Sequence, residues 1–190
     1  AIQGGPGEND GITYNADGSI TLSLYAPGKE FVYAIGDFSD WEIDADYFMK
    51  RDGDHWWITL PASAFTAGEE YDFQYLVDGT IRVADPFAHK VRSPQDDGIS
   101  DAVYPDLQPY PRDKTENLVS VLRPGAQAPT DTVQFEPPPR EDLVIYELLV
   151  RDFVERSSYE VLADTLGYLE RLGVNAVEVM PVANFGGNNS

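Results

Sequence analysis

Residues 71–83 read YDFQYLVDGTIRV and carry a complete β-hairpin signal. Aromatic and apolar side chains occupy every second position from Tyr71 to Val77, so they share one face of a strand. Asp78-Gly79 is a dipeptide that favours the tight turn between two antiparallel strands, and Ile81-Arg82-Val83 supplies the returning strand. The segment therefore predicts a hairpin with one buried face.

The residues before this hairpin continue the same short-strand pattern. Further strands are predicted over 19–25, 31–35 and 56–60, each bounded by turn residues such as Asp17-Gly18 and Asp52-Gly53. Trp56 is in phase with Ile58 and Leu60 and is expected in the core, which places Trp57 on the opposite face. Strands at this spacing, without helical periodicity between them, favour a small antiparallel β-sandwich.

The hydrophobic pattern of the sequence changes twice after the predicted sandwich. Residues 106–141 are rich in proline, ending in Pro137-Pro138-Pro139, and predict an extended linker. Residues 143–150 are then mostly apolar, as expected of a strand buried on both faces. Ser157 with Glu160 predicts a helix start, a leucine stripe from Leu162 to Leu172 runs at helical spacing, and Gly173 ends the helix.

A second apolar strand, residues 176–180, completes a β-α-β unit with parallel strands. Such a unit leaves most of its apolar surface uncovered, so we expect an incomplete domain. The predicted organisation is a sandwich over residues 1–105, a linker over 106–141 and a β-α-β unit over 142–190. We also expect self-association through the unfinished strands, whose exposed edges template pairing.

The composition narrows the classes of partner and of chemistry that are expected for this chain. The formal charge is −20, from 33 acidic and 13 basic residues, which disfavours nucleic acid and membrane surfaces but not neutral ligands such as sugars. Cysteine is absent and there are two histidines, so disulfide, thiol and typical zinc chemistry are not expected. The location stays open between the cytoplasm and export after removal of a signal outside this numbering.

Several motifs resemble the α-amylase superfamily, in the subgroup with an N-terminal isoamylase-type module of immunoglobulin-like fold. Residues 36–41, GDFSDW, and residues 71–79 followed by 84–88, ADPFA, look like the two signatures of that module. Residues 144–153, VIYELLVRDF, and 169–182, LERLGVNAVEVMPV, are similar to the first two strands of the catalytic barrel.

This resemblance implies a mainly β chain, namely the sandwich followed by a truncated (β/α)8 barrel fragment. It further implies that the parent protein is a retaining α-glucan hydrolase or branching-type transferase that uses two carboxyl groups roughly 5–5.5 Å apart. The family carries its catalytic carboxylates after the fourth, fifth and seventh strands. This chain has only the first two, so we expect it to be inactive alone and need no cofactor.

The resemblance also points to α-glucan polysaccharide or oligosaccharide as a partner of the sandwich. Trp41 stands where glucan-binding relatives place a sugar-stacking tryptophan, and Trp57 is the second candidate carbohydrate-binding residue. The alternative for Trp41 is packing within its loop, and for Trp57 it is packing against the linker or the barrel. Gln74 and Ile81 stand where those relatives tend to have lysine and a second tryptophan, which weakens the match.

Three hypotheses follow: part of an α-glucan enzyme, a free-standing α-glucan-binding module, or a brace for the barrel. The barrel-like strands favour the first over the second, and the first and third are compatible. Within those strands, Glu147, Glu178 and Asp152 are interpreted as structural carboxylates. A calcium ion is conceivable in the parent, but no acidic turn has the spacing of an EF-hand loop.

Overall fold

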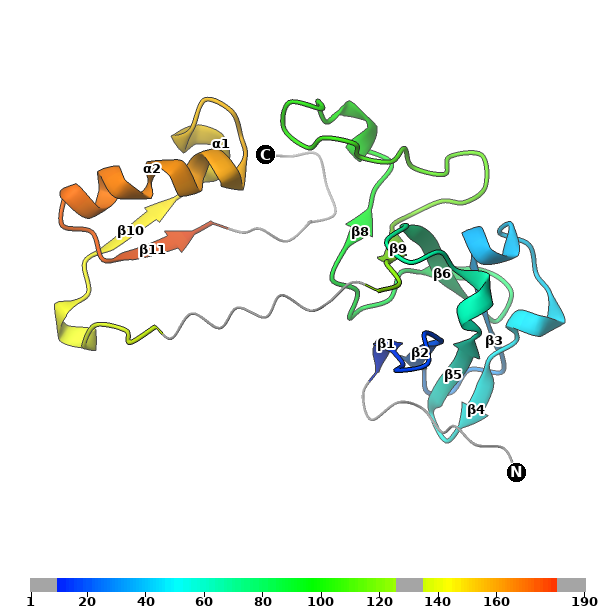
Figure 1. Cartoon of the computed structure of the whole chain (residues 1–190). Coiled ribbons are helices and arrows are strands. Elements are labelled where there is room, and N and C mark those ends of the chain that lie inside the picture. Colours follow the sequence, from blue (N-terminus) through cyan, green and yellow to red (C-terminus); the bar gives the residue numbers. More distant parts are fainter. Residues whose placement is uncertain (1–9, 126–134, 181–190) are drawn as a thin grey trace. The chain divides into compact units, whose positions relative to one another are not determined.

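The computed structural model describes residues 10–125 and 135–180 (Figure 1). The chain divides into two compact units, residues 1–98 with 109–130 and residues 99–108 with 131–190. Each unit is described by itself.

The first unit is a sandwich of two antiparallel sheets. Sheet A has the order β1-β2-β5-β4 and comprises β1 (Gly11–Tyr14), β2 (Ile20–Tyr25), β5 (His55–Leu60) and β4 (Lys50–Asp52). Sheet B has the order β3-β6-β9-β8, with β7 also paired to β6, and comprises β3 (Val32–Gly36), β6 (Tyr71–Val77), β9 (Val119–Leu122), β8 (Val91–Arg92) and β7 (Ile81–Val83). The sandwich predicted from the short alternating strands is confirmed.

The core lies between the two sheets. Leu22 pairs with Ile58 and Leu24 with Trp56 across β2 and β5, and these side chains meet the inner face of β6. Phe73 and Tyr75 of β6 are fully buried in the same cluster, as the alternation in this strand predicted. The period of two in both sheets therefore determines which residues enter the core.

The turn between β6 and β7 has the predicted geometry. Asp78 and Gly79 both have positive φ, 49° and 72°, as the two central residues of a type I′ hairpin require. The Asp78 carboxylate also accepts the N–H of Glu30 at 2.9 Å, so the turn is tied to the start of β3.

One strand lies inside the segment that the sequence assigned to the linker. β9 pairs antiparallel with both β6 and β8, and its four residues are all buried. The expectation of an extended linker over 106–141 was therefore wrong for this part. Val119 and Val121 do alternate with Ser120 and Leu122, but four residues among prolines are too few for a clear strand signal.

The second unit contains the predicted β-α-β arrangement. Its strands β10 (Ile145–Leu148) and β11 (Ala176–Val179) are parallel and are joined through α1 (Val150–Phe153) and α2 (Tyr159–Arg171). The helix α2 begins one residue later than predicted, because Ser158 is the N-cap and its hydroxyl accepts the N–H of Glu160 at 3.2 Å. Gly173 follows the helix with φ 87°, as expected of a C-terminal cap.

The apolar face of the second unit is only partly covered within the unit. Leu148, Leu162 and Leu169 form its buried cluster. Leu166 is 42% exposed and Leu172 58%, so only part of the leucine stripe is buried. The described residues also form five short 3-10 helices: η1 (Asp37–Ser39), η2 (Ala45–Tyr47), η3 (Ala62–Ala64), η4 (Asp96–Gly98) and η5 (Arg140–Asp142). In the described ranges, no helix has the length and apolar character that crossing a bilayer requires.

Candidate functional site

Trp41, the first candidate sugar-binding residue, sits in a strained loop after β3. Asp40 and Trp41 have φ values of 50° and 64°, in the left-handed region that is unusual for a bulky side chain. Two hydrogen bonds hold this conformation: the Trp41 N–H donates to the Gly36 carbonyl at 2.9 Å, and the indole Nε1 donates to Asp37 Oδ1 at 3.0 Å. Trp41 is nonetheless only 6% exposed, so its ring is not open to solvent here.

The ring of Trp41 is closed off on the outer face of sheet B. It belongs to a second apolar cluster with Ile35 of β3, Leu76 of β6, Val119 of β9 and Tyr110. Tyr110 comes from the connection between β8 and β9, and it is 5% exposed. We call residues Tyr110 to Leu118 the cover segment, because this stretch lies over the face of the sheet that carries Trp41.

Gln74 fastens the cover segment to the sheet. It is fully buried, and its amide nitrogen donates to the carbonyls of Glu116 at 2.8 Å and Leu118 at 2.7 Å. Its amide oxygen accepts the hydroxyl proton of Thr115 at 2.6 Å. Gln74 thus has a structural role at the position where the resemblance expects a sugar-contacting lysine.

Further polar contacts hold the cover segment at its margins. The Tyr110 hydroxyl donates to the Asn117 carbonyl at 2.6 Å, and Arg82 of β7 donates to the Thr115 hydroxyl at 3.2 Å. Lys114 forms an ion pair with Asp40, next to Trp41. The cover segment therefore touches both the sheet and the Trp41 loop.

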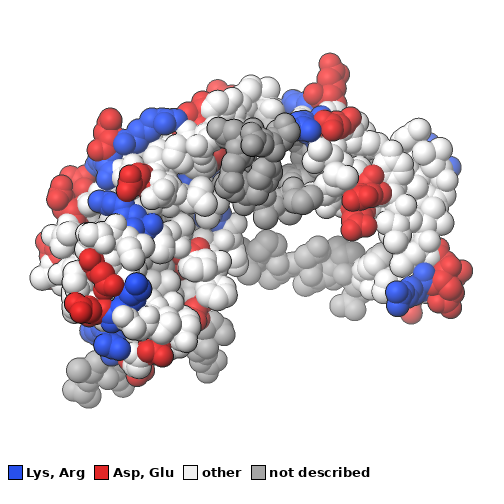
Figure 2. All heavy atoms as spheres, turned by 180° about the vertical axis from the view of Figure 1, so that it is seen from behind, with Lys and Arg blue, Asp and Glu red and all other residues white. Residues whose placement is uncertain are grey.

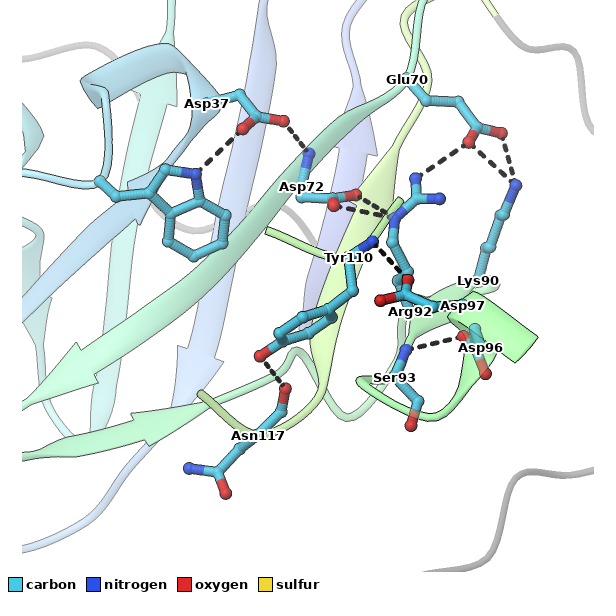
Figure 3. Close-up of polar contacts among 11 residues, drawn as sticks. Asp37, Glu70, Asp72, Lys90, Arg92, Ser93, Asp96, Asp97, Tyr110 and Asn117 are labelled. Atoms are coloured by element: carbon cyan, nitrogen blue, oxygen red, sulfur yellow. Dashed lines mark hydrogen bonds and ion pairs between the residues drawn. The ribbon is translucent and has the colours of Figure 1, made fainter. Parts of the chain in front are cut away.

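A buried ionic cluster adjoins Tyr110 on the same face (Figure 3). Arg92 of β8 has a side chain only 1% exposed, and its Nε donates to Asp72 at 2.8 and 3.1 Å. Glu70 accepts from Arg92 at 3.3 Å and from Lys90 at 2.7 Å. The backbone N–H of Asp72 donates to Asp37 Oδ2 at 2.7 Å, which connects this cluster to the Trp41 loop.

The pKa values of the two carboxylates beside Arg92 are shifted in opposite directions. Burial raises the pKa of Asp72 above its ordinary value and outweighs the hydrogen bond and attraction of Arg92. Burial also acts on Glu70, but the hydrogen bond from Lys90 and the attraction of Lys90 and Arg92 outweigh it and lower the pKa. Asp72 is thus the carboxylate whose ionised state depends most on keeping Arg92 beside it.

Asp97, beyond β8, positions the start of the cover segment. Its carboxylate accepts the N–H of Tyr110 at 3.1 Å (Figure 3). It also accepts the N–H of Arg112 Nε at 2.6 Å. The Tyr110 hydrogen bond, followed by the one from Arg112, holds the pKa of Asp97 below its ordinary value. Sequence patterns had not singled out Tyr110, Arg92 or Asp97, and the only available signal was an aromatic residue between Pro109 and Pro111.

Trp57, the second candidate, lies on the outer face of sheet A. It is 5% exposed, and the Lys50 ammonium stands 4.6 Å from its ring centroid. Trp56 is in the core between the sheets, as predicted. Ile81, by contrast, is 46% exposed on β7. The structure does not bring Trp41 and Trp57 together, because Trp41 packs on the outer face of sheet B and Trp57 lies on the outer face of sheet A. Their sugar-binding roles stay predictions.

The second signature of the sandwich has a packing role. Asp85, at its Ala-Asp-Pro step, is buried and accepts the hydroxyl proton of Tyr75 at 2.7 Å and the N–H of Phe87 at 2.8 Å. Burial raises the pKa of Asp85 above its ordinary value. This motif therefore anchors the loop after β7 to the core.

The candidate carboxylates of the second unit form no catalytic arrangement. Glu147 and Glu178 stand opposite one another in the parallel pair β10–β11, and both are exposed. Asp152 forms an exposed ion pair with its neighbour Arg151 at 2.9 Å. In residues 10–125 and 135–180, no three side chains of the His, Cys, Asp and Glu types converge as a metal site would require. On the face drawn in Figure 2, acidic side chains are scattered rather than gathered in one patch.

Comparison with known proteins shows which class of protein module the sandwich resembles. Residues 11–88 match the sequence profile of carbohydrate-binding module 48, the isoamylase N-terminal domain. Most strands of the sandwich therefore lie within the part of the chain that matches this class of module.

The relatives extend the match into the second unit. A malto-oligosyltrehalose trehalohydrolase of Saccharolobus solfataricus is 33% identical over 141 residues, which are 74% of this chain and 21% of the relative. A 1,4-alpha-glucan branching enzyme of Clostridium perfringens is 25% identical over 181 residues, 90% of this chain and 25% of the relative. The pullulanase of group B Streptococcus in complex with maltotetraose has a TM-score of 0.65 at 20% identity, over 94% of this chain and 24% of that one.

The chain therefore resembles the N-terminal regions of a malto-oligosyltrehalose trehalohydrolase and of 1,4-alpha-glucan branching enzymes, and residues 11–88 within it match carbohydrate-binding module 48. It spans about a fifth to a quarter of the length of the relatives it matches.

Proposed function

We propose that this chain is the non-catalytic front part of an enzyme that cleaves or transfers glycosyl units of α-glucans. The observation that carries the proposal is the order of the two units. A module-48 sandwich is followed by a parallel β-α-β unit, and the branching-enzyme match runs through both. We further propose that the sandwich braces the barrel to which the second unit belongs.

The residues of the second unit support the non-catalytic assignment. Retaining cleavage needs two carboxyl groups on opposite sides of a bound sugar, roughly 5–5.5 Å apart. Glu147 and Glu178 instead lie side by side within the paired strands β10 and β11, each as the third of four residues, rather than facing one another across a space for a sugar. Exposed apolar residues of this unit, among them Ile145 and Leu172, are the surface on which we propose that the rest of the barrel packs.

Activity measurements test this proposal. The 190-residue chain, incubated with amylopectin and with malto-oligosaccharides, is expected to release no reducing ends and to leave the chain-length distribution unchanged. The full-length gene product is expected to change one or both. Turnover by the 190-residue chain that disappears in Glu147→Gln or Glu178→Gln would overturn the non-catalytic assignment.

A second candidate function is α-glucan binding by the sandwich. It is favoured by the module-48 match and by the left-handed conformation at Trp41, because backbone strain of this kind concentrates at ligand sites. Native gel mobility with and without amylopectin tests it on the wild type, on Trp41→Phe and on Trp57→Phe, so that the two candidate residues are compared directly. Retardation by amylopectin that is lost only in Trp41→Phe supports this site. If amylopectin does not change the mobility of the wild type, bracing of the barrel is the one proposed function of the sandwich that remains.

A further inference from the structure

We infer that the cover segment is a displaceable lid, and that an α-glucan chain reaches Trp41 only when Tyr110 moves off the outer face of sheet B. This inference rests on the second candidate function, glucan binding by the sandwich. It concerns how that face becomes accessible, and it assigns to Tyr110 and Lys114 a role in controlling affinity.

The lid is separable from the fold because it contributes no strand to either sheet. β8 ends at Arg92 and β9 begins at Val119, so the whole cover segment lies in the connection between two strands. The hydrogen bonds of β9 to β6 and β8 involve residues 119–122 and stay intact when the cover segment lifts. Opening therefore requires the loss of loop contacts only, which is the kind of motion that lids and binding loops undergo.

The contacts that close the lid are of two kinds. The first kind is the exposed ion pair, of which there are two examples, Lys114–Asp40 and Arg112–Asp97. The side chains of Lys114 and Arg112 are 48% and 55% exposed, and ion pairs between exposed groups add little to stability. The stronger contacts are the burial of Tyr110 and the hydrogen bonds of Gln74. Tyr110 thus fills the apolar face above the sheet, and Gln74 fixes the backbone that carries it.

The loop beneath the lid is strained, which favours opening. Asp40 and Trp41 are consecutive residues with left-handed backbone, and such a conformation persists only where surrounding contacts enforce it. Two hydrogen bonds of Trp41, to Gly36 and Asp37, hold it from within the loop, and the Lys114–Asp40 pair joins the lid to the same loop. Release of Lys114 therefore weakens the restraint on the same loop that carries the indole.

The face that opening uncovers has the chemistry that a pyranose recognises. The indole of Trp41 offers an apolar surface for the carbon face of a sugar ring. Gln74, released from Thr115 and from the two lid carbonyls, offers both a donor and an acceptor for sugar hydroxyls. The ligand is neutral, so the net charge of −20 does not repel it. If most lids are closed, the apparent Kd equals the Kd of the open form divided by the fraction of molecules that are open, so binding is weaker.

The test uses locked and opened forms of the 190-residue chain. The chain has no cysteine, so Asp40→Cys/Lys114→Cys carries the only thiols, which a short bis-maleimide joins to lock the lid. The matched control is the same double variant before cross-linking. Affinity for maltoheptaose is measured by calorimetry, and acrylamide quenching reports the exposure of tryptophan.

Cross-linking is expected to weaken binding about tenfold or more relative to the control. Tyr110→Ala is expected to strengthen binding and to raise quenching. Lys114→Glu, which places two like charges together at the lid edge, serves as a second opened form if Tyr110→Ala does not fold.

The outcomes separate the two proposals. Wild-type binding that neither the lock nor the opened forms alter overturns the lid while leaving glucan binding intact. Absence of binding in the wild type and in both opened forms, with quenching raised, overturns glucan binding by this face and with it the lid.

Discussion

Arg92→Met is expected to lower the free energy of unfolding of the sandwich by about 3–5 kcal/mol, the usual consequence of removing one partner of a buried ion pair. The Arg92 side chain is 1% exposed and that of Asp72 is 8% exposed. Methionine fills much of the volume of the arginine stem, so the loss comes from the charge rather than from a cavity.

The size of this effect follows from the contacts that Arg92 makes. The single N–H of its Nε is shared between both oxygens of Asp72, at 2.8 and 3.1 Å, and a charge-assisted hydrogen bond contributes about 1.5–3 kcal/mol. Glu70 keeps Lys90 in the variant, but Asp72 loses its ion-pair partner and stays buried. The larger share of the loss is therefore assigned to Asp72.

The loss is also expected to depend on pH. Burial already raises the pKa of Asp72 in the folded state, and removal of Arg92 raises it further. A carboxyl whose folded pKa exceeds its unfolded value destabilises the fold above that pKa and ceases to do so once both states are protonated. The difference between wild type and variant should therefore shrink as the pH falls through the raised pKa toward the ordinary value.

Urea unfolding followed by tryptophan fluorescence measures both effects, since all three tryptophans lie in the sandwich. Urea is preferred to guanidinium chloride because it does not screen charges. The control is Arg92→Met/Asp72→Leu, which replaces both partners and should recover most of the stability. A loss below about 1 kcal/mol for the single variant, or an equal loss in the double variant, would refute the reasoning.

Three other substitutions probe the remaining contacts. Gly36→Ala places a Cβ against the carbonyl oxygen of Asp72, so we expect a loss of about 1–3 kcal/mol in urea unfolding, and an unchanged midpoint would contradict this close approach. Gln74→Leu leaves two lid carbonyls without a donor and should cost about 2–4 kcal/mol; a thermal melt like that of the wild type would show that water replaces the amide. Ser158→Ala removes the cap of α2 and should cost about 1 kcal/mol, seen as faster amide exchange at Glu160 with the sandwich unaffected.

The architecture was predictable because its strands and helix carry strong local signals. The alternation from Tyr71 to Val77 and the Asp78-Gly79 turn needed no tertiary information, and both are confirmed. The shift from a period of two to a helical period located the second unit in the same way. β9 was missed because its position is determined by pairing with β6 and β8 rather than by its own sequence.

The candidate site was less predictable, because its state depends on a contact between residues far apart in the chain. The sequence around Trp41 allowed either sugar stacking or loop packing, and the burial of Trp41 in one cluster with Tyr110 is a property of the fold. Gln74 similarly has a partner set, residues 115–118, that no pattern links to it. Arg92 lies in a two-residue strand, where periodicity carries no information about burial.

The position of β9 has a consequence for how the chain folds during synthesis. β9 lies between β6 and β8 in sheet B, although it is the last strand of the sandwich along the sequence. Pairing of residues 71–73 with 120–122 is a non-local contact, and such contacts slow folding because a long loop must close first. Sheet B therefore cannot be completed until residue 122 has left the ribosome. At about 5–20 residues per second, an unfinished apolar sheet edge at β6 persists for seconds, during which a chaperone has time to bind it.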